Sequence, residues 1–397
     1  MRIAVLGVGT AGIVSLCHTL KWMCPEGSTV TSIYDPSVPV LGVGEASQPN
    51  FVKSLFEGAN FDFITDAKEI DATIKFGATY IDWREHNFNM SIEPPNYGIH
   101  FNNLKLKAFC FKKFKQIWGN KFNVIEGKIT NLVSLPSHAG VTVNNMLYQF
   151  DYVIDCRGTP LDLNDYNITD TTVNHCLVNI IDSPGNWNST VNQATPNGWM
   201  FKIPLSTRQG WGYLYNDTLT TKEEAFDNFK SILTTDNLQI KEFVFKSYYA
   251  KQFFDGRILK NGNRAFFFEP IEGLSSFFYD SILRYFIDYV QGNISIDSFN
   301  ESLEKTAWDM ENFVHFLYQG GSNFDSKFWN NQKEISGRHL RKKTNYQWRK
   351  VLLNVRKQLE SPTMQMPIDA TGRWSSVLWA KWAEELDYDY FDNQLKL

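Results

Sequence analysis

The sequence predicts an α/β fold in which a nucleotide-binding core carries an added β-sheet and a mainly helical C-terminal part. Three patterns predict it. A glycine-rich turn joins an apolar strand to an apolar helix at the start of the chain. Residues 199–216 alternate apolar and polar side chains, which is typical of a hairpin. Residues 277–318 carry apolar side chains at three- and four-residue spacing, which is typical of helices.

Composition and charge exclude several classes of protein. The chain has 397 residues, of which 43% are hydrophobic and 21% are charged, so it can bury a sizeable core in two or three domains and is not disordered. The net charge of -4 lacks the excess of positive charge that is typical of general nucleic-acid binding. The 5 cysteines are irregularly spaced without a C-x-x-C pair, which predicts no disulfide framework and fits a reducing cytoplasm. No apolar run is long enough to cross a bilayer without carrying a charge.

Strands and helices are expected in the following order. Short apolar runs predict buried strands at Arg2–Leu6, residues 30–34 and residues 150–154. Helical spacing predicts helices over residues 13–23, 61–85, 103–115, 277–290 and 296–318. The expectation for 61–85 rests on Ile70, Ile74, Ala78 and Ile81. A glycine-rich loop at 320–323 is expected to end the last helix, and most of the chain beyond it is expected to be helical.

The turn after the first strand carries a dinucleotide-binding pattern. Gly7, Gly9 and Gly12 form G-x-G-x-x-G, with Thr10 and Ala11 between the last two glycines. Such a turn lets a diphosphate approach the backbone closely, and the start of the helix offers N–H groups and partial positive charge. Asp35 follows Gly12 by 23 residues at a strand end, where an acid would bind ribose hydroxyls. The alternative is an ordinary glycine-rich turn.

Two further stretches favour FAD over NAD. A second glycine-rich stretch follows the second strand and contains Gly44, Glu45, Ala46 and Ser47. The strand at 150–154 leads into Asp155, and in flavoprotein oxygenases such an aspartate commonly contacts the ribityl or ribose region of FAD.

These stretches, with three others, resemble the flavin-dependent halogenases of the tryptophan-halogenase type. Residues 44–47 resemble the family's G-V-G-E-[AS]-T stretch, and residues 75–83 resemble K-x-G-x-x-F-x-x-W, which begins at the family's essential lysine, here Lys75. Residues 97–101 resemble Y-x-x-H-[FL], residues 199–204 resemble W-x-W-x-I-P with Phe201 in place of the second tryptophan, and residues 269–275 resemble E-P-L-E-S-T-G. The likeness covers roughly residues 1–290. The short chain, rich in Asn and Phe, also resembles phage-encoded (cyanophage) members.

The resemblance implies a reaction and the residues that perform it. Reduced FAD from a separate flavin reductase, with O₂, oxidises a halide ion to hypohalous acid, which reacts with a small electron-rich aromatic substrate. Lys75 delivers the oxidant, by hydrogen bonding to it or as a haloamine, and Glu272 stabilises the cationic intermediate and removes its proton. The backbone N–H groups of Leu274 and Ser275 hold the halide. FAD contacts are expected from Gly7, Gly9, Thr10, Ala11, Gly12, Asp35, Gly44, Glu45, Ala46, Ser47, Asp155 and Ser276. Substrate or tunnel contacts are expected from His100, Trp199, Phe201, Ile203 and Pro204.

Each assignment has a structural alternative. A lysine on a helix can extend its charge to solvent, and Glu272 or the side chains of Ser275 and Ser276 can cap the following helix. Trp199 and Phe201 can form one apolar face of a strand. Gly273 stands where the family has serine and leaves room for a larger anion, so bromide or iodide is expected to be preferred over chloride.

The expected domains are residues 1–175 (first part of a glutathione-reductase-type, Rossmann-like FAD core), 176–250 (β-rich insertion), 251–295 (second part of the core, with the halide site) and 296–397 (helical cap). One competing function is an FAD-dependent aromatic monooxygenase that reduces its own flavin with NAD(P)H. Another is a non-catalytic FAD-binding or nucleic-acid-associated protein, because residues 105–121 and 333–357 are rich in Lys and Arg among aromatics. The acidic chain favours solvated helix faces instead, so no nucleic-acid partner is expected. No H-x-x-x-H pair occurs, and no metal is expected. A homo-oligomer is left open, and the expected location is the cytoplasm of a bacterium, or of the host if the chain is phage-encoded.

Overall fold

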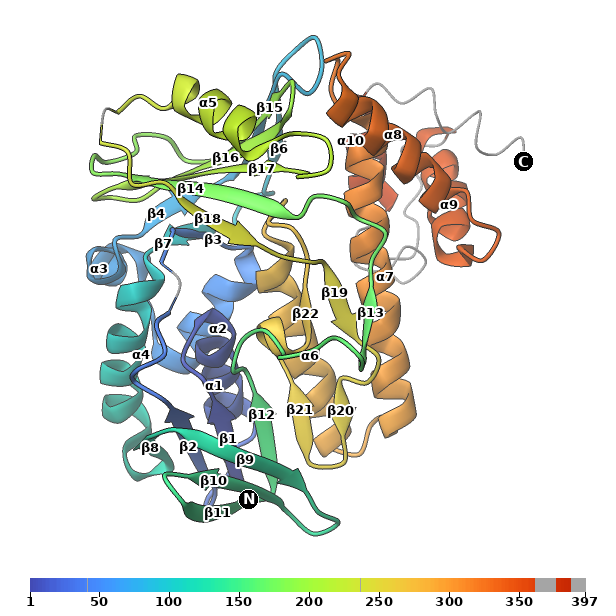
Figure 1. Cartoon of the computed structure of the whole chain (residues 1–397). Coiled ribbons are helices and arrows are strands. Elements are labelled where there is room, and N and C mark those ends of the chain that lie inside the picture. Colours follow the sequence, from blue (N-terminus) through green and yellow to red (C-terminus); the bar gives the residue numbers. More distant parts are fainter. Residues whose placement is uncertain (41, 236, 361–375, 387–397) are drawn as a thin grey trace.

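A six-stranded sheet forms the centre of the nucleotide-binding part of the computed structural model, which describes residues 1–40, 42–235, 237–360 and 376–386 (Figure 1). Its order is β20-β21-β12-β1-β2-β8, and all neighbours run parallel except β20. The strands are Phe254–Asp255, Ile258–Lys260, Tyr152–Asp155, Arg2–Leu6, Thr29–Tyr34 and Phe122–Glu126. The three predicted buried strands are β1, β2 and β12, so their continuous apolar runs fit a sheet that is covered on both faces.

Helices cover one face of this sheet and an antiparallel meander covers the other. The helices are α1 (Thr10–Trp22), α2 (Pro49–Ala59), α4 (Asn103–Trp118) and α6 (Leu274–Val290), and α1 packs against the other three. The meander is β9 (Ile129–Ser134), β10 (Ala139–Val143) and β11 (Met146–Phe150), whose apolar side chains bury those of β1 and β12. This layering is a Rossmann-like core, as the sequence predicts.

A seven-stranded sheet lies above the core in Figure 1. Its order is β18-β14-β17-β16-β15-β5-β6, antiparallel except for β15 beside β5. The strands are Lys241–Val244, His175–Ile181, Gln209–Tyr215, Gly198–Pro204, Thr190–Thr195, Gly77–Ile81 and Phe88–Ser91. The hairpin expected over 199–216 is confirmed as β16 and β17. Helix α5 (Lys222–Ile232) covers the outer face through Ala225 and Phe229.

The expected helix over residues 61–85 is wrong. Only α3 (Phe63–Asp66) and a 3-10 turn (Ala67–Ile70) are helical, and the chain then forms β4 (Thr73–Lys75) and β5. The β-branched residues of this stretch favour strands, and the helical spacing of its apolar residues was coincidental. Gly77 lies where a Cβ would meet the carbonyl oxygen of Met90 at 2.3 Å, which is a close approach between two strands. Lys75 is therefore on a strand.

Two small sheets join the large ones. β3 (Glu45–Ala46), β7 (Gly98–Phe101) and β4 form the first, and β13 (Tyr166–Ile168), β19 (Tyr248–Ala250) and β22 (Phe266–Phe267) form the second. The first sheet places the second glycine-rich stretch beside Lys75, because β3 and β4 both pair with β7.

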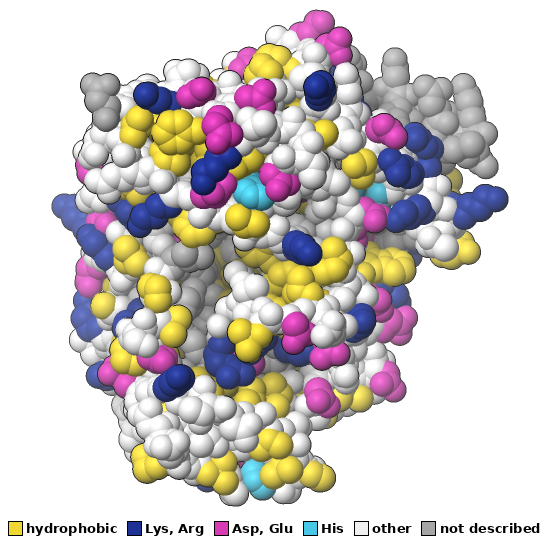
Figure 2. Space-filling view, in the orientation of Figure 1, with side chains coloured by type: hydrophobic (Ala, Val, Ile, Leu, Met, Phe, Trp, Pro, Cys, Tyr) yellow, Lys and Arg dark blue, Asp and Glu magenta, His cyan; other side chains and the backbone are white. Residues whose placement is uncertain are grey.

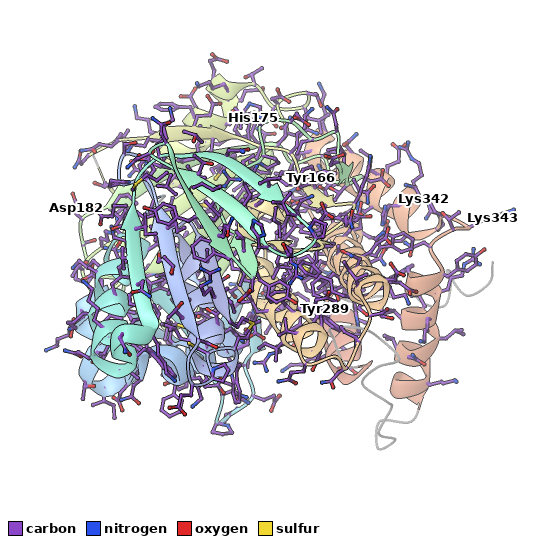
Figure 3. All side chains as sticks on the ribbon, turned by 90° about the horizontal axis from the view of Figure 1, so that it is seen from below. Tyr166, His175, Asp182, Tyr289, Lys342 and Lys343 are labelled. Carbon is purple, nitrogen blue, oxygen red and sulfur yellow. The ribbon has the colours of Figure 1, made fainter. Side chains whose placement is uncertain are left out.

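Helices form the C-terminal part. They are α7 (Ile296–Gly320), α8 (Lys327–Leu340), α9 (Tyr346–Glu360) and α10 (Ser376–Glu385), and α7 ends at the predicted glycine loop. Figure 3 shows Lys342 and Lys343 at the outer edge of this part, away from the sheets. Residues 361–375 and 387–397, to which the helical prediction also extends, lie outside the described residues. None of the described helices combines the length and apolar character that crossing a membrane requires. The predicted fold class is confirmed.

Candidate active site

The glycine turn after β1 leaves open space at the start of α1. Gly7 has φ +94°, and a Cβ on Gly12 would lie 2.2 Å from the Gly7 carbonyl oxygen, so the turn is as tight as it can be. A Cβ on Gly9 would meet nothing within 4 Å, and no side chain caps the helix. Exposed N–H groups at an uncapped helix start favour phosphate oxygens. The turn therefore fits the diphosphate of FAD.

Asp35 and Asp155 lie at the carboxyl ends of β2 and β12, as predicted. The Asp35 carboxylate accepts hydrogen bonds from Ser37, 2.9 Å from its N and 2.6 Å from its Oγ, and these lower the pKa of Asp35. Asp155 is buried and binds two guanidinium groups, with Oδ1 2.8 Å from Arg157 Nε and Oδ2 3.0 Å from Arg264 Nε. A direct contact of Asp155 with FAD stays a prediction, and two arginines lie where the sequence pointed to an acid alone.

A cavity of about 430 Å³ lies between the core and the seven-stranded sheet. Apolar side chains gather at the middle of this face of the molecule (Figure 2). The cavity brings together eleven of the predicted site residues: Thr10, Gly44, Glu45, Ala46, Lys75, Phe201, Ile203, Glu272, Leu274, Ser275 and Ser276. They come from the glycine turn, β3, β4, β16 and the start of α6. A largely apolar cavity with a few convergent polar groups is typical of a small-molecule site.

Lys75 is the buried cation of this cavity. Its side chain is 1% exposed, and its partner in the β4–β7 register is Gly98. His100, also on β7, is buried between the hydroxyls of Thr73 and Thr190, at 3.1 and 3.0 Å. Burial and the nearby charge of Lys75 hold the pKa of His100 well below its ordinary value, so its ring is neutral. The buried Lys75 side chain also lines the cavity, where a lysine amine can polarise an oxidant.

Glu272 stands in a left-handed backbone conformation, φ +56°, immediately before α6. Its carbonyl oxygen accepts a 2.6 Å hydrogen bond from Gln48 Nε2. Its carboxylate Oε1 accepts a 2.6 Å hydrogen bond from the hydroxyl of Tyr80 on β5. The ring of Tyr80 packs on Phe88 and on Trp83, and on Trp382 of α10. Glu272 is therefore a carboxylate fixed at the cavity wall.

The start of α6 faces the same cavity. Gly273 is the N-cap residue, with φ +59°, and no side chain caps the helix. The helix begins at Leu274, three residues before the start expected at residue 277. The alternative in which Ser275 or Ser276 caps the helix through its side chain is therefore absent. The Ser276 hydroxyl instead lies 3.1 Å from the backbone N of Gln48 and joins α6 to the second glycine-rich stretch. An uncapped helix start in a cavity that Lys75 also lines has the polarity that an anion needs.

The expected substrate and tunnel residues are only partly in the cavity. Phe201 and Ile203 line it, whereas Trp199, Pro204 and His100 are not among its lining residues. Trp199 is fully buried, and its Nε1 donates to the Tyr318 hydroxyl at 2.8 Å. That hydroxyl donates to Glu269, and burial raises the pKa of Glu269 to about 8. Trp199 thus anchors α7 to the second part of the core.

The sequence analysis missed two groups: Asn192, which lines the cavity, and Tyr80, which does not line it but hydrogen-bonds to Glu272. Tyr80 occupies the Phe position of K-x-G-x-x-F-x-x-W, and that departure was a usable signal. Asn192 on β15 is the register partner of Tyr80, is 1% exposed, and its amide makes no hydrogen bond to the described residues. No local pattern identifies Asn192, because its place depends on the parallel pairing of β5 with β15.

A cluster of metal-ligand types lies in the helical part, outside the cavity. Donor atoms of Glu311, His315 and His339 lie within 4.8 Å of one another. The two imidazoles stack with centroids 4.0 Å apart and 22° between planes, and His339 Nδ1 lies 2.7 Å from Asp170 Oδ2. Both nitrogens of His339 lie at hydrogen-bond distance from protein groups, since Nε2 lies 3.2 Å from Asn312 Oδ1. The expectation of no metal stays a prediction.

Comparisons with known proteins agree with this geometry. The protein-family model for tryptophan halogenases matches residues 2–139 and 92–366. The tryptophan 6-halogenase ThaL of Streptomyces albogriseolus and the tryptophan 7-halogenase RebH of Lentzea aerocolonigenes are each 21% identical, over 84% of this chain and 79% of the relative. A flavin-dependent halogenase from Xanthomonas campestris has the same fold, with a TM-score of 0.82 at 17% identity over 97% of this chain and 88% of that chain. A tryptophan halogenase from Shewanella frigidimarina superposes with a TM-score of 0.80 at 16% identity, over 100% and 94%. The resemblance in the motifs is thereby confirmed, and the chain belongs to the tryptophan halogenase family of flavin-dependent halogenases.

Proposed function

We propose that this flavin-dependent halogenase uses Lys75 to deliver hypohalous acid across the cavity to a small electron-rich aromatic substrate. Reduced FAD and O₂ supply the oxidising power that converts a halide to hypohalous acid. The observation that carries the proposal is the convergence of Lys75, Glu272 and the start of α6 on one cavity that also contains Thr10 of the glycine turn. The Lys75 ammonium donates to the oxygen of hypohalous acid and makes its halogen more electrophilic.

Glu272 acts on the substrate in this proposal. When the halogen bonds to a ring carbon, the ring becomes a cation that has to lose the hydrogen on that carbon. A fixed carboxylate stabilises the cation and accepts the proton, and general-base catalysis of this kind contributes roughly 10²–10⁴-fold. The position of Glu272 at the wall that contains Lys75 supports this role.

The halide site in the proposal is the start of α6. Gly273 has no side chain, and a Cβ there would have the carbonyl oxygen of Ala46 as its nearest neighbour, at 3.3 Å. The space that a serine side chain would fill is left to the anion. Bromide and iodide are larger and more easily oxidised than chloride, so we propose that they are preferred.

The proposed partners follow from the family. Two relatives are named as tryptophan halogenases, so indoles are the first substrates to test. Family members generally take reduced flavin from a separate reductase, and we propose the same for this chain. The cytoplasmic location, phage origin, oligomeric state and absence of nucleic-acid partners stay predictions.

One experiment tests the function. The protein is incubated with FAD, a flavin reductase, NADH, an aromatic library and equal chloride, bromide and iodide, and products are identified by mass spectrometry. We expect halogenated products, mainly brominated or iodinated. We expect none with Lys75→Ala, whose reduced flavin is still reoxidised by O₂.

Other outcomes exclude parts of the proposal. Halogenation retained in Lys75→Ala removes Lys75 from the mechanism, and dominant chlorination removes the halide preference. Hydroxylated products, with rapid flavin reduction by NAD(P)H without the reductase, would establish the monooxygenase instead.

A further inference from the structure

The Tyr80 hydroxyl donates a hydrogen bond to Glu272, the residue that is predicted to act as the base. It lies 2.6 Å from Glu272 Oε1, and the two residues are 192 positions apart in the sequence. Tyr80 belongs to β5 of the seven-stranded sheet, whereas Glu272 precedes α6 of the core. The hydrogen bond therefore joins the two halves of the cavity at the carboxylate.

The ring of Tyr80 is held so that its hydroxyl has one position. Tyr80 is 0% exposed. Its ring stacks on Phe88 at 4.9 Å with 4° between planes, and the edges of Trp83 and Trp382 pack against it at 5.4 and 5.1 Å. Aromatic contacts of this kind restrict the ring without using its hydroxyl. Phenylalanine would pack the same way, so replacing Tyr80 by phenylalanine tests the polar contacts of the tyrosine oxygen, above all the hydrogen bond to Glu272.

The hydroxyl remains a donor throughout the working pH range. Burial, and then the negative charge of Glu272, raise the pKa of Tyr80 well above its ordinary value. A phenol that keeps its proton can donate to a carboxylate but cannot take a proton from the substrate. This excludes Tyr80 as the base and leaves it a role through its neighbour.

We propose that Tyr80 is a positioning residue that fixes Oε1 of Glu272, so that the other oxygen accepts the proton of the halogenated ring. This inference rests on the proposed function of Glu272. In the step concerned, the ring C–H bond breaks, its electron pair restores the aromatic ring, and the proton passes to the carboxylate. Tyr80 keeps its own proton.

The test is Tyr80→Phe, which removes one oxygen and keeps the ring contacts. Loss of this hydrogen bond frees the carboxylate to turn away from the substrate, so kcat for halogenation falls while the KM for the aromatic substrate stays unchanged. Because a hydrogen bond to a charged group is worth roughly 1.5–3 kcal/mol, kcat falls about 10- to 100-fold. Reoxidation of reduced flavin by O₂ stays unchanged, because the Tyr80 hydroxyl contacts Glu272 and Tyr80 does not line the cavity.

The matched control is Tyr213→Phe. Tyr213 is also fully buried in the seven-stranded sheet, its hydroxyl lies 2.8 Å from Thr195 Oγ1, and it does not line the cavity. Loss of this hydroxyl removes a buried hydrogen bond without touching Glu272, so kcat stays unchanged. A purely structural role for Tyr80 would give the same result in both variants, with lower thermal stability and an unchanged kcat.

A double-mutant cycle with Glu272→Gln completes the test. If Tyr80 acts through Glu272, then Tyr80→Phe costs no further activity in the Glu272→Gln protein. Independent, multiplicative losses overturn the inference, as does an unchanged kcat in Tyr80→Phe. Failure of the proposed function looks different, because the unaltered protein itself then yields no halogenated product.

Discussion

At the scale of the residue, the cavity contains a polar group that the fold alone leaves unsatisfied. The Asn192 amide is buried and makes no hydrogen bond to the described residues. Burying an amide without a partner costs roughly 1–3 kcal/mol by mutational measures. A polar group that is buried at this cost in a cavity wall is suited to bind a ligand. Here the ligand would be an aromatic ring with one substituent that donates a hydrogen bond and one that accepts a hydrogen bond.

We predict that Asn192→Leu raises the KM for the aromatic substrate about tenfold and leaves the melting temperature of the apoprotein equal or higher. The physical reason is that leucine removes both the ligand contact and the unsatisfied amide. Steady-state kinetics and thermal unfolding measure the two effects. An unchanged KM would show that the substrate does not contact this amide.

The residues predicted from the sequence were those in contiguous motifs. Lys75, Glu272 and the glycine turn could be found because each lies within a short stretch whose spacing is specific. Tyr80 was visible only as a departure from a motif, and Asn192 and Arg264 were not visible, because tertiary pairing places them. Trp199 has the motif and lies on the same face of β16 as Phe201 and Ile203, but its indole N–H bonds to Tyr318 of α7 and it does not line the cavity. The motif therefore identified the strand and its face, but not how far the cavity extends along it.

At the scale of the element, two glycines of the β1–turn–α1 unit are needed for different reasons, one for folding and the other for binding. Gly12 is required by the protein itself, since a Cβ there would lie 2.2 Å from the backbone oxygen of Gly7. Gly9 has ordinary dihedral angles, φ -69° and ψ -177°, and a Cβ there would meet no protein atom within 4 Å. The absence of a side chain at Gly9 therefore serves the ligand.

We predict opposite results for two substitutions in this unit. Gly12→Ala destabilises the apoprotein by about 1–3 kcal/mol, as overpacking does, whereas Gly9→Ala leaves its stability nearly unchanged. Gly9→Ala weakens FAD binding tenfold or more, because its methyl group takes the space of the diphosphate. Urea unfolding and FAD titration measure the two quantities. Full FAD affinity in Gly9→Ala would place the diphosphate elsewhere.

Elements whose sequence fits only a helix or only a strand were predicted well, whereas a stretch whose sequence fits both was not. Buried strands such as β1 and long helices such as α7 have unambiguous patterns. Residues 61–85 combine helical spacing with β-branched residues, and pairing with β7 and β15 decided in favour of strands. Pairing partners that lie far along the chain cannot be read from a local window.

At the scale of the whole molecule, buried acids determine how stability depends on pH. Burial raises the pKa of Glu45 and Glu269 to about 8 and that of Glu311 to about 7, from an ordinary value of 4.5. As pH rises above 4.5, the unfolded chain releases protons that the folded chain retains. The free energy of unfolding therefore falls with rising pH until the pH passes the pKa values that these acids have in the folded protein. Burial lowers the pKa of His100 and His315 from 6.5, which works in the opposite direction but only up to about pH 6.5.

We predict that the free energy of unfolding of the apoprotein falls between pH 6.5 and 8.5. Each raised acid contributes up to about 1.4 kcal/mol per pH unit within its own range. Urea unfolding at a series of pH values measures the slope, and Glu269→Gln makes it shallower because that side chain does not titrate. A flat profile over this range would mean that the three acids ionise normally.

The packing of Trp382 against Tyr80 has a consequence for synthesis on the ribosome. Lys75, Tyr80 and the glycine turn emerge early in translation, but the ring wall that holds Tyr80 lacks Trp382 until the chain has been made as far as α10. The aromatic wall around Tyr80 is therefore complete only after nearly the whole polypeptide has been translated.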